Sequence, residues 1–113
     1  MDDCVFCKII TGEIKSPILY DDGDFVIFRD IDPKAPVHLL AVPKRHYPGF
    51  TDMTVPDGER LSAFLAKLPD VAVDLGLQNG FRCVVNQGAD AGQSVSHLHI
   101  HLLGGKRLAW PEL

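Results

Sequence analysis

Several short stretches of this chain are rich in apolar and β-branched residues and are bounded by turn residues, a pattern typical of strands. Residues 18–30 contain two such stretches on either side of Asp22-Gly23, a pair that favours the tight turn of a hairpin. Three further strands are predicted at residues 37–43, 81–86 and 97–103.

A longer segment, residues 57–77, has the spacing of a helix. Its apolar residues recur at three- and four-residue steps and would line one side of that helix: Leu61, Phe64, Leu65, Leu68, Ala72 and Leu75. Pro69 falls inside the segment, and a proline ring removes a backbone donor and clashes with the preceding turn. We therefore expect a kink or two abutting helices there, and one or two further helical turns at residues 5–10.

The order of these elements is strand, strand, strand, helix, strand, strand. This order predicts an α+β fold with a mainly antiparallel five-stranded sheet, one main helix and a short N-terminal helix. No repeat, low-complexity tract or linker interrupts the chain, so we expect a single domain over residues 1–113.

Composition narrows the possible function classes. Of the 113 residues 46% are hydrophobic and 23% are charged, which is ordinary for a globular domain. The net charge of −4 argues against nucleic-acid binding, which needs a basic patch. Basic residues are scattered, and no apolar run reaches the length of a membrane span, so no membrane partner is expected.

The three cysteines bear on the cellular compartment. The acidic start lacks the basic region of an export signal, so we expect a cytoplasmic protein whose thiols stay reduced. Cys4-x-x-Cys7 has the spacing of a metal-ligand pair, but one such pair is weak evidence and is also compatible with redox chemistry. Cys83, in an apolar segment, is expected to be a buried small hydrophobe.

The predicted strand 97–103 carries histidines at every second position: His97, His99 and His101. Side chains of a strand alternate between its faces, so the three imidazoles would share one face and the residues between them would form an apolar one. Such a row has three interpretations: polar residues on a solvated face, a three-histidine metal centre with an open position, or nucleophilic attack on phosphorus by a neutral imidazole.

The preceding loop, residues 86–94, favours the third interpretation. Its glycines, Gly88 and Gly92, allow backbone N–H groups to form a concave anion site, and its side chains add neutral donors. The loop lacks the lysine of a P-loop, so it does not look built for a triphosphate with magnesium.

The segment HLHIHLL resembles the motif His-x-His-x-His-x-x, with apolar x, that names the histidine triad (HIT) superfamily. Four stretches resemble its Hint branch, the nucleoside phosphoramidases, in a bacterial-type form with a CxxC pair: CVFCKIITGEI, FRDIDPKAPVHLLAVPKRH, VVNQGADAGQSVSHLHIHLLGG and Trp110-Pro111. The resemblance extends from about Cys4 to Pro111. The Gly104-Gly105 pair and the Trp-Pro tail favour Hint over the fragile-histidine-triad branch, which cleaves dinucleoside polyphosphates.

This resemblance implies hydrolysis of adenosine or guanosine 5′-phosphoramidates through a nucleotidyl-histidine, with no catalytic cofactor. The nucleophile would be the middle histidine, His99, with its tautomer fixed by the carbonyl of His97. Ser94 would relay a proton to the leaving amine, and His38 matches the family's fourth active-site histidine. The positions that match the family's phosphate contacts are Asn86, Gly92, Gln93, Ser94 and His101.

By the same resemblance, the nucleoside pocket would be formed by Phe6, Ile14, Phe28, Asp30, Ile31 and Leu40. The carboxylate of Asp30 suits the ribose hydroxyls because it accepts two hydrogen bonds. Without the family, the apolar members of this set would be interpreted as ordinary core residues. Family members dimerise, so Trp110 is expected to close the site of the partner subunit in a homodimer.

The resemblance also bears on the CxxC pair. Some HIT members complete a tetrahedral Zn²⁺ site with two histidines, and the matching positions here are His46 and His97. Two thiolates and two imidazoles would make a closed, structural site with Cys4 and Cys7.

Two other functions stay open: cleavage of dinucleoside polyphosphates or related nucleotides by the same nucleophile, and nucleotide binding without catalysis.

Overall fold

The computed structural model describes residues 3–110, and Pro111 of the predicted Trp-Pro tail lies outside the described residues. Within this range the helices and strands are α1 (Val5–Thr11), β1 (Tyr20–Asp21), β2 (Phe25–Arg29), β3 (Val37–Pro43), α2 (Val55–Asp74), β4 (Phe81–Val84) and β5 (Ile100–Gly104). Two short 3-10 turns, η1 (Phe50–Asp52) and η2 (Ala89–Ala91), lie in the loops.

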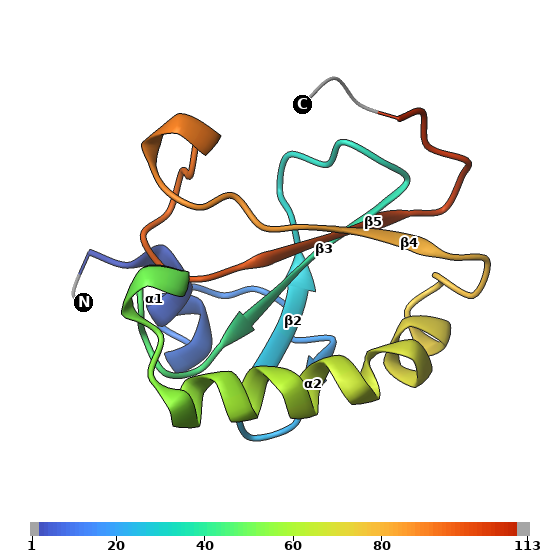
Figure 1. The fold of residues 1–113 in the computed structure, drawn as a ribbon. Coiled ribbons are helices and arrows are strands. Elements are labelled where there is room, and N and C mark those ends of the chain that lie inside the picture. Colours follow the sequence, from blue (N-terminus) through green and yellow to red (C-terminus); the bar gives the residue numbers. More distant parts are fainter. Residues whose placement is uncertain (1–2, 111–113) are drawn as a thin grey trace.

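The strands form one antiparallel sheet in the order β1-β2-β3-β5-β4 (Figure 1). The strand β5 is inserted between β3 and β4, so the last strand along the chain lies near the centre of the sheet. This confirms the predicted α+β class with a five-stranded antiparallel sheet and two helices. The strand β3 has the predicted bounds, residues 37–43. The two strands of the hairpin, β1 and β2, lie within the predicted residues 18–30.

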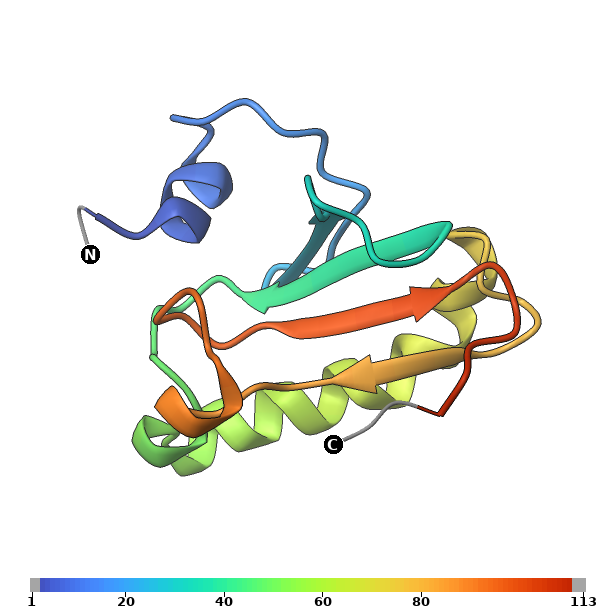
Figure 2. The same ribbon diagram turned by 90° about the horizontal axis from the view of Figure 1, so that it is seen from above.

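The two faces of the sheet carry different apolar clusters. On one face, α2 packs Phe64, Leu68 and Ala72 against residues of β2, β3 and β5. On the other face, Phe6 of α1 packs against a second cluster. That cluster contains Val26, Phe28, Leu40 and Val42. Figure 2 shows α1 well away from α2, so each helix covers its own face.

The helix α2 differs in four ways from its prediction. It begins at Val55 rather than residue 57, because Thr54 and Asp57 form a capping box, and it ends at Asp74 rather than residue 77, because Gly76 has a φ of 86° that does not continue a helix. It is one helix with Pro69 inside it, not two abutting helices. Pro69 and the residue four positions earlier, Leu65, both lie on the exposed side, so water can solvate the carbonyl that the proline leaves without a donor. Leu65, 45% exposed, is therefore not part of the predicted core stripe.

The predicted fifth strand begins too early. β5 starts at Ile100, so His97 and His99 precede it, because the backbone N–H of Leu98 donates to the carbonyl of Tyr47 and not to β3. The alternation of faces nevertheless holds: Ile100 and Leu102 join the cluster under α2, whereas His97 and His99 contact Phe6.

The fourth strand is also shorter than predicted. β4 ends at Val84, which pairs with His101, because β5 extends only one residue further in that direction. Cys83 in this strand is exposed, so the expectation of a buried cysteine was wrong. β4 is an edge strand, and its side chains have a neighbouring strand on one side only. No helix within residues 3–110 has the length and apolar character to cross a membrane.

Candidate functional site

The five histidines are brought together from three parts of the fold. His97, His99 and His101 come from β5 and the segment before it, His38 comes from β3, and His46 from the loop after β3. They form two groups. His99, His101 and His38 make one, and His46 and His97 join the thiols of α1 in the other.

The geometry of His99 defines a single tautomer. Its Nδ1 lies 2.8 Å from the backbone carbonyl of His97, so Nδ1 carries the hydrogen and donates it. In the neutral ring, the other nitrogen, Nε2, then carries the lone pair. The residue is only 4% exposed, and the edge of the Phe6 ring lies against it at a centroid distance of 5.1 Å. This is the state that a nucleophilic imidazole requires.

His38 and His101 are linked by a chain of hydrogen bonds with one direction. The backbone N–H of Lys34 donates to His38 Nδ1 at 2.9 Å, so His38 holds its hydrogen on Nε2. That nitrogen lies 2.9 Å from His101 Nδ1 and donates to it. His101 therefore holds its hydrogen on Nε2. Burial lowers the pKa of His101, which keeps the ring neutral at pH 7.

Asp30 lies beside this pair. Its Oδ2 is 3.3 Å from His38 Nε2 and 4.0 Å from His101 Nδ1, and its Oδ1 accepts from the N–H of Asp32. The three side chains could in principle hold a metal ion. However, a metal on His38 Nε2 would force the hydrogen onto Nδ1, where the Lys34 N–H already points. The arrangement therefore favours hydrogen bonding over metal binding.

The glycine loop is braced by Gln93. Gly88 and Gly92 have φ values of 80° and 73°, which glycine adopts without strain. Gln93 Oε1 accepts from Gly88 N–H, its Nε2 donates to the carbonyls of Pro48 and Val95, and its backbone N–H donates to Gly88. The donors of Gln93 are thus occupied within the protein, and the residue shapes the loop. Ser94 is exposed and Asn86 half-buried.

The residues predicted for the nucleoside pocket fall into two sets. Phe6, Phe28 and Leu40 lie together in the cluster on the α1 face, next to His99. Ile14 and Ile31 are 38% and 100% exposed and take no part in that cluster. Trp110, 80% exposed, lies against the guanidinium of Arg82 at 5.7 Å, and Arg82 also donates to the carbonyl of Ala109. The described tail thus folds along β4 of its own chain.

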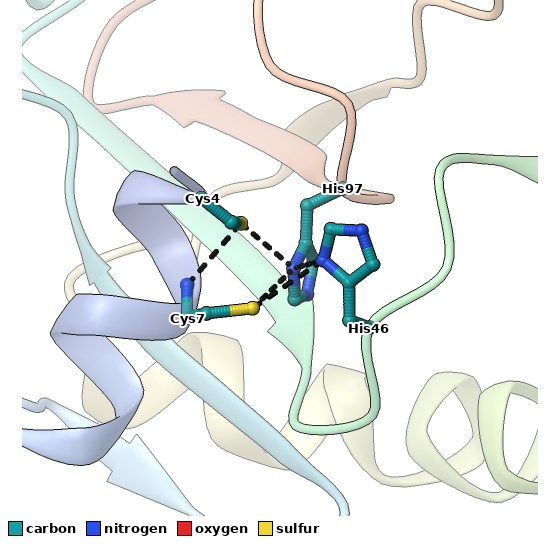
Figure 3. A group of neighbouring side chains, drawn as sticks. All are labelled: Cys4, Cys7, His46 and His97. Atoms are coloured by element: carbon teal, nitrogen blue, oxygen red, sulfur yellow. Dashed lines mark hydrogen bonds between the residues drawn. The ribbon is translucent and has the colours of Figure 1, made fainter. Parts of the chain in front are cut away.

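The second group consists of Cys4, Cys7, His46 and His97, whose ligand atoms all lie within 4.8 Å of one another (Figure 3). His97 Nδ1 is 3.1 Å from His46 Nδ1, 3.4 Å from Cys4 Sγ and 3.6 Å from Cys7 Sγ. A tetrahedral zinc site would place two nitrogens about 3.4 Å apart and a nitrogen and a sulfur about 3.6 Å apart. The four residues fit a zinc ion.

The protonation of this group also suits a metal. His97 Nε2 lies 2.8 Å from the carbonyl of Pro43 and donates to it, which leaves the Nδ1 lone pair facing the thiols. Burial lowers the pKa of His97 to about 4, so the ring is neutral. Burial and the neighbouring Cys4 raise the pKa of Cys7 to about 11 without a metal; a bound cation would deprotonate the thiol.

Three backbone groups of this site had no counterpart in the sequence analysis. The carbonyl of Pro43, the carbonyl of Tyr47 and the N–H of Lys34 orient His97, Leu98 and His38. Backbone groups carry no residue-type signal. Two of them lie in the loops that flank β3, residues 30–36 and 44–49, and the third, Pro43, is the last residue of β3 itself.

The comparisons with known proteins agree with this geometry. The HIT domain matches residues 11–108 of the chain. This chain belongs to the HIT family. An uncharacterised HIT-like protein of Synechocystis is 44% identical over 110 residues, which cover 97% of this chain and 96% of the relative.

Two solved structures of HIT proteins are similar to this chain over most of its length. A HIT family hydrolase from Clostridium thermocellum has a TM-score of 0.91 and 40% identity, and the match covers 100% of this chain and 99% of the other. A zinc-bound histidine triad family protein from Mycobacterium smegmatis has a TM-score of 0.79 and 30% identity, and the match covers 96% of this chain and 81% of the other. The family and the HIT-like fold are therefore established for this chain.

Proposed function

We propose that this HIT protein is a purine nucleoside phosphoramidase that hydrolyses the P–N bond of adenosine or guanosine 5′-phosphoramidates through a nucleotidyl-histidine. One observation carries the proposal. The hydrogen bond of 2.8 Å between His99 Nδ1 and the carbonyl of His97 leaves Nε2 of a buried, neutral-tautomer ring as the attacking atom. Relatives described as HIT family hydrolases support the general reaction class.

In the first step, His99 Nε2 forms a bond to the α-phosphorus, and the bond from phosphorus to the amine nitrogen breaks. Charge that grows on the phosphoryl oxygens needs donors already in place. His101 supplies its Nε2–H, because the chain from Lys34 through His38 keeps that hydrogen on Nε2. Asn86 and Ser94 supply further donors from the loop that Gln93 braces, whereas the N–H of Gly92 donates to the carbonyl of Ala89 and shapes the turn of that loop.

The leaving amine takes up a proton as it departs, and Ser94 is proposed to relay it. In the second step, water attacks phosphorus, the bond from phosphorus to His99 Nε2 breaks, and the nucleoside monophosphate leaves. The proton released by water passes back to Ser94 and replaces the one that the amine carried off, while His99 keeps its Nδ1–H throughout and regains the Nε2 lone pair when the bond to phosphorus breaks. No metal takes part in either step.

The nucleoside would lie against the α1 face of the sheet. Phe6, Phe28 and Leu40 form an apolar wall there, which suits a purine ring. The carboxylate of Asp30, beside His38, is proposed to accept hydrogen bonds from the ribose hydroxyls. Ile14 and Ile31 are exposed enough to cover the outer side of a bound base.

We further propose that Cys4, Cys7, His46 and His97 hold a structural zinc ion. The fit of the four ligand atoms to a tetrahedron and the orientation of His97 by Pro43 support this. Bound zinc would stabilise the attachment of α1. The zinc-bound relative supports the choice of metal.

The remaining proposals rest on the resemblance: a single HIT domain, a cytoplasmic location, and a homodimer in which Trp110 reaches the partner subunit. A sedimentation mass equal to one chain would refute the dimer and the role of Trp110 together.

The reaction is tested by quenching the protein during turnover of adenosine 5′-phosphoramidate and measuring its mass. An added nucleotidyl group on His99, absent from a His99→Ala variant, is the expected result. Cys83→Ser, at an exposed cysteine outside both histidine groups, is the matched control. Faster turnover of a diadenosine polyphosphate would favour the other hydrolase class. If the wild type and His99→Ala both bind nucleotide and the wild type turns over no P–N substrate, the chain is a nucleotide-binding protein without catalysis.

A further inference from the structure

The helix α1 has few attachments to the rest of the domain. Its backbone hydrogen bonds close on themselves: Lys8 donates to Cys4, Gly12 to Ile9 and Ile14 to Lys8. Among the described residues, no backbone hydrogen bond joins α1 to the sheet. A seven-residue helix is not stable alone, so side chains must hold it in place.

Two kinds of side-chain attachment do this. The first is apolar: Phe6, 6% exposed, packs its ring edge-on against Phe28 at 5.5 Å and against His99 at 5.1 Å, and Ile9 and Ile10 pack against the same cluster further along the helix. The second is the pair of thiols, Cys4 and Cys7, which face the imidazoles of His46 and His97 (Figure 3).

The first turn of α1 is otherwise loosely seated. A cavity of about 460 Å³ lies between Cys4 and Val5 on one side and Ser94 and Ser96 on the other, with His46 at its edge. The thiols contact the imidazoles directly, at 3.4 Å from Cys4 Sγ to His97 Nδ1 and 3.3 Å from Cys7 Sγ to His46 Nδ1, whereas the cavity separates part of this turn from the 94–96 segment.

Phe6 lies between the two cysteines in sequence, within the same turn of helix. When both thiols are tied to His46 and His97 by a metal, Phe6 cannot leave His99 without breaking the metal site. When the thiols are free, only the apolar packing of α1 opposes that movement. The ring that covers the nucleophile is thus coupled to the thiol–imidazole group.

We propose that metal occupancy of Cys4, Cys7, His46 and His97 controls nucleotide binding, because it clamps α1 and holds Phe6 against His99. The clamp acts on the wall of the nucleotide pocket and takes no part in the chemistry. This inference rests on the proposed function only in taking a nucleotide as the ligand. The clamping of α1 itself does not depend on it.

Thermodynamic linkage makes the proposal quantitative. If zinc tightens AMP binding by some factor, AMP must tighten zinc binding by the same factor. We expect removal of zinc to weaken AMP binding about tenfold or more. The Phe6→Ala variant should retain zinc, bind AMP as weakly as the zinc-free protein does, and show no coupling between the two ligands.

The experiment compares the full chain loaded with zinc and stripped by a chelator. Hydrogen exchange over residues 3–14 measures how firmly α1 is held against the sheet, and calorimetric titration with AMP measures the affinity of the nucleotide pocket. Zinc affinity is measured with and without AMP, and Cys83→Ser is the control for a cysteine outside the clamp. Circular dichroism shows whether the stripped protein keeps its fold.

Faster exchange over residues 3–14 on stripping, with equal coupling factors in the two directions, is the expected outcome. Unchanged exchange, equal AMP affinity in the two forms, or failure of the chain to take up zinc would overturn the proposal. If the stripped protein unfolds, His46→Ala, which removes one ligand and leaves Phe6 in place, takes its role: wild-type exchange over residues 3–14 with wild-type AMP affinity in that variant overturns the proposal, and faster exchange with weakened affinity supports it. If AMP binds neither form, the proposed function fails. The exchange data alone then decide whether zinc clamps α1.

Discussion

The direction of the hydrogen bonds at His38 can be tested with two substitutions of that residue. The ring connects the Lys34 N–H to His101 Nδ1, with 2.9 Å on each side. An asparagine oxygen can occupy the place of Nδ1 and accept from Lys34, but it provides no donor to His101. A glutamine amide nitrogen can occupy the place of Nε2 and still donate to His101. His38→Asn and His38→Gln therefore remove opposite ends of the chain.

The expected loss of activity follows from the hydrogen bond that His101 loses. Without the donor from position 38, its Nδ1 is a buried acceptor with no partner, a state that costs about 1–3 kcal/mol. The hydrogen can then move to Nδ1, which turns the Nε2 lone pair toward the phosphoryl oxygens. At 1.36 kcal/mol per tenfold, kcat/KM of His38→Asn should fall about 5- to 150-fold. His38→Gln should lose less, and His101→Ala, which removes the donor altogether, about 100- to 1,000-fold.

The assay is hydrolysis of adenosine 5′-phosphoramidate, with thermal unfolding as the check that each variant folds. Nitrogen NMR of the imidazoles supplies a readout that a purely structural role for His38 would not change: His101 should keep its Nε2–H tautomer in His38→Gln and lose it in His38→Asn. Equal activity of the two variants, or greater loss in the glutamine variant, would refute the assigned direction of the chain.

Three stability predictions follow from the packing. Asp57→Asn should lower the free energy of unfolding by about 2–3 kcal/mol at pH 7, because its buried carboxylate pairs with Arg45 through two bonds of 2.7 Å and caps α2. Arg45 lowers the pKa of Asp57, so this stabilisation is complete above the unfolded value of about 3.9 and is lost progressively as pH falls from there through the lower folded value; the difference between the two proteins in urea titrations should therefore be smaller at pH 3 than at pH 7. Phe64→Ala should cost about 3–5 kcal/mol in the same titration, because the ring is fully buried and stacks on a second phenylalanine at 4.5 Å; a loss below 1 kcal/mol would contradict the assigned core. Gly104→Ala should destabilise by about 1–3 kcal/mol, since its Cβ would lie 2.5 Å from a leucine side chain, whereas Gly58→Ala in α2 should stabilise by about 0.5–1 kcal/mol; the reverse order of melting temperatures would contradict both.

Local patterns were sufficient to predict most elements of the fold. Residues 37–43 form a strand with both faces covered, so their nearly continuous apolar run predicts its bounds. The start and end of α2 are marked by Thr54 and Gly76, yet the prediction began at residue 57 because it followed the apolar stripe and not the cap. Pro69 does not divide the helix, so of the two expected outcomes the one with two abutting helices was wrong. A proline on the solvent side of a helix leaves an unbonded carbonyl that water can satisfy.

The start of β5 could not be found from periodicity. Alternation of side chains continues through His97 and His99, but strand assignment depends on the backbone partner, and Leu98 bonds to Tyr47 in a distant loop. The tautomers of the histidines could not be predicted for the same reason. They depend on Pro43, Lys34 and the carbonyl of His97, and the sequence alone does not show which backbone group faces which ring.

His97 has a part in both histidine groups, which limits what its substitution can reveal. Its Nδ1 faces the thiols, its Nε2 donates to Pro43, and its carbonyl accepts from His99. Removal of the ring therefore disturbs the metal group directly and the nucleophile through the backbone. Substitution of His46 removes a ligand while the carbonyl of His97 and its bond to His99 remain. Loss of nucleotide affinity in His46→Ala would then act through the position of α1, and loss that appears only in His97→Ala would act through the tautomer of His99.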